Sequence, residues 1–201
     1  SRLNALDQVD NIELQTVDSI FSNQLMRLQE TAIKFESRLF VSDQKITMGA
    51  KLLGNEISLT EEDSKGMSTT RSEASLSTSV YIQDELEIAD DIKANVGARF
   101  TYYRGTRIVY FEPRIAVDWA AHDNFSLKAN FGQFAQTVRR IRPQNLFLNS
   151  PDLWRLSGFD QVPVLQTKYV SLGGLFTKGQ LTIDVEGYYK TSTGLIVDPG
   201  L

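Results

Sequence analysis

The chain has no cysteine and only one histidine, and this shortage removes several classes of site. Without thiols, disulfide frameworks, thiolate metal sites and cysteine nucleophiles are excluded. The single histidine, His122, excludes zinc sites built from several histidines and leaves little room for a Ser-His-Asp triad. The 201 residues hold 25 acidic and 21 basic side chains, so the basic surplus typical of nucleic-acid binding is also missing. We therefore expect no nucleic-acid partner.

Long apolar runs are missing as well. Nowhere do 18 apolar residues follow one another, so the sequence predicts no transmembrane helix. No basic-then-apolar leader opens the chain, and we expect no export signal within this stretch. A membrane β-barrel stays open as an alternative, because its strands alternate between apolar and polar residues and are hydrophilic on average.

What the sequence does contain is a period of two in hydrophobicity, which recurs from about Thr31 to Lys190 and predicts β-strands. The clearest strand covers residues 92–103, and residues 12–21 are a weaker candidate. The apolar face of the clearest strand holds Ile92, Ala94, Val96, Ala98, Phe100 and Tyr102, and its polar face holds Lys93, Asn95, Gly97, Arg99, Thr101 and Tyr103. Asp84 is an exception, since it falls on the apolar face of its own predicted strand.

The predicted connections alternate between short and longer. Turns are expected near residues 42–44, 89–91, 120–124 and 177–180, and the other connections cover residues 55–72, 104–108 and 137–166. This order puts short turns at one end of the sheet and longer loops at the other, as in an up-and-down meander. The prediction is therefore an all-β protein, with residues 1–201 forming one antiparallel, up-and-down segment of roughly 8–10 strands.

Three features favour a barrel whose apolar face meets lipid. Strands of roughly 10–12 residues suit a tilted crossing of a bilayer. The polar face carries charges of both signs at mid-strand, as a wet or plugged interior would. Aromatic residues gather at strand ends, as in the girdles at membrane interfaces, with Tyr102, Tyr103, Tyr110 and Phe111 at one end and Trp119, Phe125 and Phe176 at the other. A water-soluble sheet whose aromatics cap its core is the alternative.

Several segments carry a family resemblance. Residues 79–86 read SVYIQDEL, and residues 95–103 read NVGARFTYY. They are followed in order by FEPRI from residue 111, FSLKANFGQF from residue 125, and VEGYYK from residue 185 with GLI from residue 194. Together these pieces resemble the barrel of TonB-dependent outer-membrane receptors, especially those of Bacteroidota, over about Gln29 to Leu201.

The resemblance implies a location in the bacterial outer membrane and the import of a scarce nutrient of the siderophore, haem, cobalamin or glycan class. The implied partners are outer-membrane lipid, a plug domain and further strands of the same receptor, and the TonB energy-transducing complex acting through the plug. A surface lipoprotein is a further candidate partner. Such barrels have about 22 strands around an N-terminal plug, so we expect this chain to be an internal barrel fragment without the plug.

The longest predicted loop, residues 137–166, is the best candidate for ligand contact. Its guanidinium groups suit an anionic ligand, and its tryptophan suits stacking on a ring. The candidate residues are Arg139, Arg140, Arg142, Trp154 and Arg155. The alternative is that these arginines pair with loop carboxylates or with lipopolysaccharide phosphates. The acidic run at residues 61–63 lacks EF-hand spacing and is interpreted as solvated loop charge, so no metal site is predicted.

Two other functions stay open at this stage. A complete eight-stranded outer-membrane barrel would act as an adhesin or a structural protein. A barrel enzyme would need a catalytic group near the long loops, whereas His122 lies in a predicted short turn at the opposite end. We therefore predict no catalytic residue, no enzyme activity and no cofactor.

Overall fold

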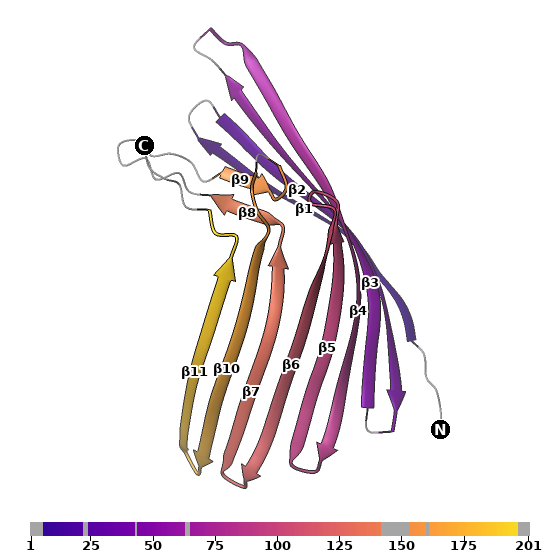
Figure 1. The fold of residues 1–201 in the computed structure, drawn as a ribbon, viewed down its shortest axis with the longest axis vertical. Coiled ribbons are helices and arrows are strands. Elements are labelled where there is room, and N and C mark those ends of the chain that lie inside the picture. The colour runs from indigo at the N-terminus through magenta and orange to yellow at the C-terminus, as the bar shows by residue number, and fades with distance from the viewer. Residues whose placement is uncertain are drawn as a thin grey trace.

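The computed structural model describes residues 6–21, 24–42, 44–62, 65–141, 153–159 and 161–196. Every regular element in these ranges is a β-strand. Over the same ranges, no helix is long and apolar enough to cross a membrane. The strands form one large curved sheet, with a small two-stranded ribbon lying across it (Figure 1).

The large sheet has nine strands, and each hydrogen-bonds to its neighbours in an antiparallel ladder. Their order follows the chain, which confirms the predicted up-and-down topology. The strands are β1 (Leu6–Phe21), β2 (Gln24–Val41), β3 (Gln44–Glu62), β4 (Ser68–Ala89), β5 (Ile92–Tyr103), β6 (Ile108–His122), β7 (Phe125–Gln136), β10 (Leu165–Lys178) and β11 (Leu181–Thr193). The ribbon consists of β8 (Val138–Ile141) and β9 (Leu153–Leu156).

The predicted long connection at residues 55–72 is wrong. Strand β3 continues to Glu62 and β4 begins at Ser68, so the two form a tall hairpin that rises above the neighbouring strands (Figure 1). The pattern failed here because the alternation reverses in this part of β3. Glu56 is exposed on the outer face, whereas Ile57 is buried on the inner face at 5% exposure. An outward polar position indicates that this part of the strand stands in water.

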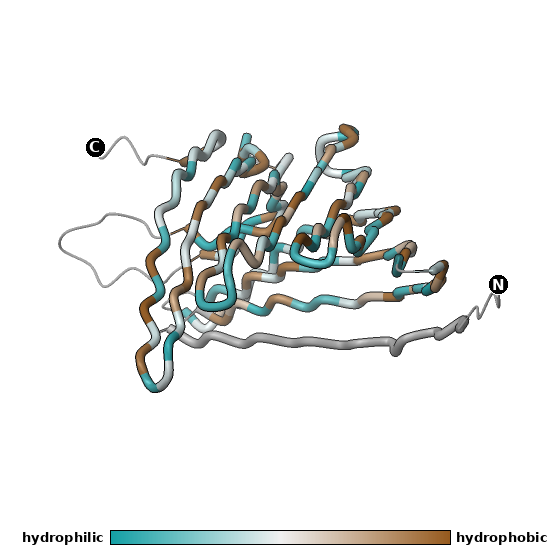
Figure 2. The backbone as a smooth tube through the Cα atoms, turned by 90° about the horizontal axis from the view of Figure 1, so that it is seen from below, coloured by the Kyte–Doolittle hydropathy of each residue, from teal (hydrophilic) through white to brown (hydrophobic). Residues whose placement is uncertain are grey.

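The apolar face of the sheet points outward, as the sequence predicts. Its large side chains stay exposed, for example Val80 at 53% and Phe100 at 46%, although they are hydrophobic. The polar face is concave, because side chains from β2 and β4 meet across the intervening β3. There the Tyr81 hydroxyl donates to Glu36 Oε2 at 2.7 Å, directly over Gly49, where a Cβ would lie 2.5 Å from the tyrosine oxygen. Figure 2 shows hydrophobic and hydrophilic residues following one another along the strands.

The predicted aromatic girdles are correct only in part. Phe111 and Trp119 are exposed on the outer face near opposite ends of β6, and the Trp119 indole donates to Asp91 Oδ2 at 2.9 Å. Tyr103 and Tyr110, in contrast, are 1% and 7% exposed on the inner face, where they pack with Val164. They belong to an internal cluster. The prediction placed them in a girdle because it judged both tyrosines by residue type and ignored their positions on the inner face.

Pro113 lies inside β6, where a proline can give no hydrogen bond to a neighbouring strand. The continuous β6–β7 ladder begins at Arg114, immediately after the proline, while the β5–β6 ladder continues past it on the other side. Beyond the proline, the side chain of Glu112 links β6 to its neighbours. Its Oε1 accepts a hydrogen bond from the backbone N–H of Ala135 on β7 at 3.0 Å, and its Oε2 accepts one from the Thr101 hydroxyl on β5 at 2.9 Å. The Glu-Pro pair therefore replaces backbone pairing with a side-chain bond.

Adjacent residues at the middle of β6 test the orientation of the sheet. Ile115 is outward, between Val96 and Phe131, and Ala116 is inward, between Asn95 and Asn130. Ile115→Arg should destabilise the barrel by about 2–4 kcal/mol, because it places a charge near the bilayer midplane. Ala116→Arg should cost much less. Urea unfolding in phospholipid vesicles measures both, and equal penalties would contradict the orientation.

Candidate functional site

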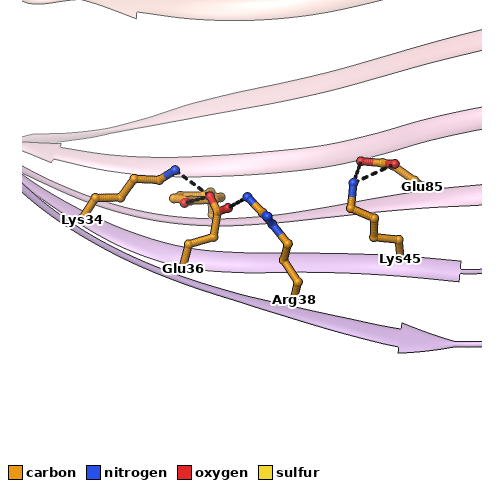
Figure 3. A network of polar contacts seen from close by, with 6 residues as sticks. Lys34, Glu36, Arg38, Lys45 and Glu85 are labelled. Carbon is orange, nitrogen blue, oxygen red and sulfur yellow. Dashed lines mark hydrogen bonds and ion pairs between the residues drawn. The ribbon is translucent and has the colours of Figure 1, made fainter. Parts of the chain in front are cut away.

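The inner face of the sheet carries a network of charged side chains centred on Glu36. Lys34 Nζ lies 2.7 Å from Glu36 Oε2, and an Arg38 nitrogen lies 2.6 Å from Oε1. Tyr81 donates a further hydrogen bond to the same carboxylate. All three neighbours come from the inward positions of β2 and β4, so the period of two brings them together (Figure 3). The carboxylate ties the two strands to each other across β3.

A cavity of about 410 Å³ opens beside this network. Lys45 of β3 pairs there with Glu85 of β4 at 3.0 Å (Figure 3). The charged residues that line the cavity are Lys34, Glu36, Arg38, Lys45, Glu85, Arg99 and Arg114. Such a surface can bind a charged occupant by hydrogen bonds and ion pairs. Sequence reasoning placed most of these charges on the inner face but did not predict that they gather.

The described part of the predicted ligand loop folds inward. It contains the β8–β9 ribbon, and β9 contacts β2, β3 and β4 of the large sheet. An Arg155 nitrogen lies 3.2 Å from Glu73 Oε1 on the inner face of β4. The backbone N–H of Trp154 donates to Met26 Sδ on β2 at 3.1 Å. The loop therefore crosses the concave face near its long-loop end, where Figure 1 shows the ribbon.

The ribbon brings four of the five predicted ligand residues together. Its register places Arg139 opposite Arg155 and Arg140 opposite Trp154. Arg139 also donates to the backbone oxygen of Gly194. The fifth residue, Arg142, lies outside the described residues.

A second cavity, of about 280 Å³, lies between the ribbon and the sheet. Its lining combines apolar and charged side chains: Met26, Ile57, Leu59, Arg71, Ser72, Glu73, Leu153, Trp154 and Arg155. One carboxylate oxygen of Glu73 is buried without a hydrogen-bond partner there. Sequence reasoning missed Arg71, which falls in the stretch 55–72 that it assigned to a loop, and Glu73, which follows that stretch directly. The only sequence signal for this part of the sheet is the short alternation of Ile57 and Leu59 with polar residues.

The segment after β9 is packed against the internal tyrosine cluster. Leu156 and Ser157 are both 0% exposed. The Tyr103 hydroxyl donates to the Ser157 backbone oxygen at 2.7 Å, and the Ser157 N–H donates to the Thr137 oxygen at 2.8 Å. These bonds fix the ends of the ribbon and hence the position of its arginines.

The described residues hold no group of three or more His, Cys, Asp or Glu side chains that could bind a metal ion. In the acidic run, Glu61 and Glu62 lie in β3 rather than in a loop, and Asp63 lies outside the described residues. His122 is the last residue of β6, exposed and beside the short turn that leads to β7. His122 therefore lies at the short-turn end of the sheet, whereas the ribbon follows the opposite end of β7.

Gly158 tests the packing of the segment after β9. Its φ is +85°, and a Cβ would collide with the backbone of Gly105. Gly158→Ala should cost more than about 1 kcal/mol and increase amide exchange over residues 153–164. Gly179→Ala is the control, because its φ is also positive at +61° but no atom lies near its Cβ position. Equal exchange in the two variants would show that the packing does not hold the segment.

Glu36 tests the charged network. Glu36→Ala should destabilise the barrel by about 1–3 kcal/mol, since it leaves Lys34, Arg38 and Tyr81 without their shared acceptor. Glu87→Ala, which removes an exposed ion pair with Lys93, should leave stability at the wild-type value. Urea midpoints of the two variants and the wild type decide the point, and an unchanged midpoint for Glu36→Ala would show that the network is not structural.

The sequence matches one protein family over most of its length. The family described as TonB dependent receptor-like, beta-barrel, matches residues 37–200. A search of curated protein sequences gave no significant match.

Solved structures of similar fold include siderophore receptors and a copper transporter. The siderophore receptor PirA of Pseudomonas aeruginosa superposes with a TM-score of 0.62 at 12% identity, covering 84% of this chain and 33% of that one. The copper transporter OprC superposes with a TM-score of 0.62 at 13% identity, covering 84% of this chain and 30% of that one. The ferric yersiniabactin uptake receptor FyuA of Yersinia pestis superposes with a TM-score of 0.58 at 11% identity, covering 88% of this chain and 31% of that one. The chain thus spans about a third of the length of these proteins.

The match to the family covers β3 to β11 in full and the last five residues of β2. The sequence resemblance is therefore confirmed, together with the predicted all-β fold and outer-membrane location. The chain belongs to the TonB-dependent receptor-like β-barrel family, whose members are outer-membrane proteins.

Proposed function

We propose that this chain forms part of the barrel wall of a receptor that imports a scarce nutrient across the outer membrane. The observation that carries the proposal is the sheet itself, whose outer face is apolar and whose concave inner face is charged. An apolar outer face is stable in lipid, and a charged inner face needs water or a polar occupant. The family match and the fold shared with siderophore and copper receptors support the same conclusion.

We further propose that residues 1–201 all belong to one barrel domain and that other strands of the same receptor complete it. Strands β1 and β11 are the edges of the nine-stranded sheet, and among the described residues no strand pairs with their outer sides. Unpaired backbone groups are costly in lipid, so both edges require partner strands. A plug domain of the same receptor would occupy the interior and receive the pull of the TonB complex. A surface lipoprotein is a further proposed partner.

The proposed ligand contacts are Arg139, Arg140, Trp154 and Arg155 of the β8–β9 ribbon, together with Arg142, which lies outside the described residues. Guanidinium groups and an indole beside a partly apolar cavity favour an anionic ligand with a ring or aliphatic portion. The siderophore, haem, cobalamin and glycan classes remain the proposed substrates. The receptor carries out transport and no covalent chemistry, in keeping with a family of transport proteins.

Uptake measurements test this function. Deleting the gene in its host should abolish energised uptake of one labelled nutrient class, with iron complexes, copper, cobalamin and glycans as the set tried. Uptake should return with the full-length gene and should require an intact TonB complex. Uptake that persists without TonB would contradict the proposal.

The ribbon is tested in the same assay. Arg140→Gln combined with Trp154→Ala should raise the half-saturating concentration at least tenfold, which corresponds to a loss of about 1.4 kcal/mol of binding energy. Arg104→Gln is the control, because Arg104 is an exposed residue in the turn between β5 and β6. If the double variant and the control take up the ligand alike, the ribbon is not the ligand site.

A further inference from the structure

The cavity between the ribbon and the sheet combines a charged wall on β4 with apolar surface around it. On the inner face of β4, Arg71 and Glu73 are two residues apart, and both line the cavity. Their partners in the β3–β4 ladder are the apolar residues Leu59 and Ile57. The strand β2 and the ribbon contribute Met26, Leu153, Trp154 and Arg155 to the lining. A group held here therefore meets a cation and an anion side by side, next to apolar surface.

The carboxylate of Glu73 has only part of its hydrogen-bonding demand met. Its Oε1 lies 3.2 Å from an Arg155 nitrogen. Its Oε2 is buried and has no hydrogen-bond partner among the described residues. A buried carboxylate oxygen without a donor is costly, and a charged donor gives it the strongest hydrogen bond. An occupant of the cavity that brings an ammonium to Oε2 would therefore be favoured.

Arg71 supplies the opposite charge. Its residue is exposed, and it forms no ion pair with another described residue. Residues two apart on a strand are separated by about 7 Å along it, a gap that two long side chains can close around one ligand group. A guanidinium group pairs with a carboxylate through two parallel hydrogen bonds. Arg71 and Glu73 can therefore hold the two charges of one zwitterionic group.

The size of the cavity narrows the class of occupant. Its volume is about 280 Å³, whereas pockets for whole small molecules start at about 300 Å³, so it suits one group of a nutrient. A free amino-acid group offers an ammonium for Glu73, a carboxylate for Arg71 and an aliphatic chain for the apolar lining. A simple anion would leave Glu73 Oε2 without a donor, and a haem or an uncharged glycan has no ammonium.

We propose that this cavity is a subsite for a free amino-acid group of the transported nutrient, with the ammonium bound by Glu73 and the carboxylate by Arg71. The inference rests on the proposed function, because it narrows the substrate of the same ribbon site. Two sources share this chemistry: a free apolar amino acid, and an iron chelate that carries an amino-acid group.

Isothermal titration calorimetry on the full-length receptor, purified in detergent, tests the proposal. The probes are leucine and the iron(III) complex of Nε-acetyl-Nε-hydroxylysine, whose hydroxamates hold the metal and leave the amino-acid group free. At least one probe should bind, and the one that binds identifies the source. Acetylation of its α-amine should raise the Kd at least tenfold, because the acetylated amine keeps an N–H but loses the charge. Absence of binding by both probes, or equal binding after acetylation, would overturn the proposal.

Two variants assign the charges. Glu73→Gln should raise the Kd of the free-amine probe at least tenfold and leave that of the acetylated probe unchanged. Arg71→Gln should weaken the free acid to the same extent and leave its methyl ester unchanged. Glu87→Gln is the control, because Glu87 lies on the same strand outside the cavity, in an exposed ion pair with Lys93.

The modified probes also report whether the cavity survives each substitution. Glu73→Gln removes the ion pair with Arg155 as well, so the ribbon itself could shift. Equal weakening of the free and the acetylated probe would show that Glu73 only supports the ribbon, and would overturn its assignment to the ammonium.

The outcome can be separated from that of the proposed function. Amine-dependent binding by a receptor that shows no TonB-dependent uptake would support the subsite and contradict nutrient import. TonB-dependent uptake of a nutrient that has no ammonium would support import and overturn the subsite.

Discussion

The constraint on which this structure depends is that backbone N–H and C=O groups must be paired inside a bilayer, where no water can satisfy them. The nine-stranded ladder meets this demand strand by strand, in chain order. Where β6 contains Pro113 and the ladder to β7 stops, the Glu112 carboxylate accepts the Ala135 N–H instead. With the backbone satisfied by its neighbours, the sequence is free to give the two faces of the sheet opposite character.

Because the backbone is satisfied by the ladder, the side chains of the two faces can suit two different environments, lipid outside and a polar interior. On the outer face, exposed Val, Ile and Phe side chains suit lipid, and on the inner face the curvature brings polar side chains of non-adjacent strands into contact. Gly49 is essential to that contact, because any side chain there would occupy the position of the Tyr81 hydroxyl. The same concavity accommodates the β8–β9 ribbon near one end and the charged cavity beside Glu36 toward the other.

Much of this arrangement follows from the sequence, because a period of two fixes the faces wherever they differ in polarity. The strands from 92 to 136, the short turns and the inward charges were predicted correctly for that reason. The tall part of the β3–β4 hairpin was not, since its outward residues leave the lipid and become polar while Ile57 and Leu59 turn inward. Tyr103 and Tyr110 were assigned to a girdle on residue type alone, although their parity already placed them on the inner face.

The candidate site was predictable in composition and not in geometry. Local sequence showed arginines and a tryptophan in one loop, and only the tertiary fold shows that the loop turns inward and pairs Arg155 with Glu73. A contact between residues 82 positions apart depends on the curvature of the whole sheet, which no local pattern encodes. The clustering of cations from four strands around the cavity beside Glu36 depends on the same curvature.

The central claim, that the apolar face meets lipid and the charged face meets the interior, can be measured residue by residue along β5. Because the chain contains no cysteine, single cysteines at positions 92–103 of a cysteine-free full-length receptor can each carry a nitroxide label. Collision rates with oxygen, which concentrates in the bilayer, should be high at the even positions and low at the odd ones. Oxygen collision rates that are high at the odd positions, or that show no period of two, would contradict the account.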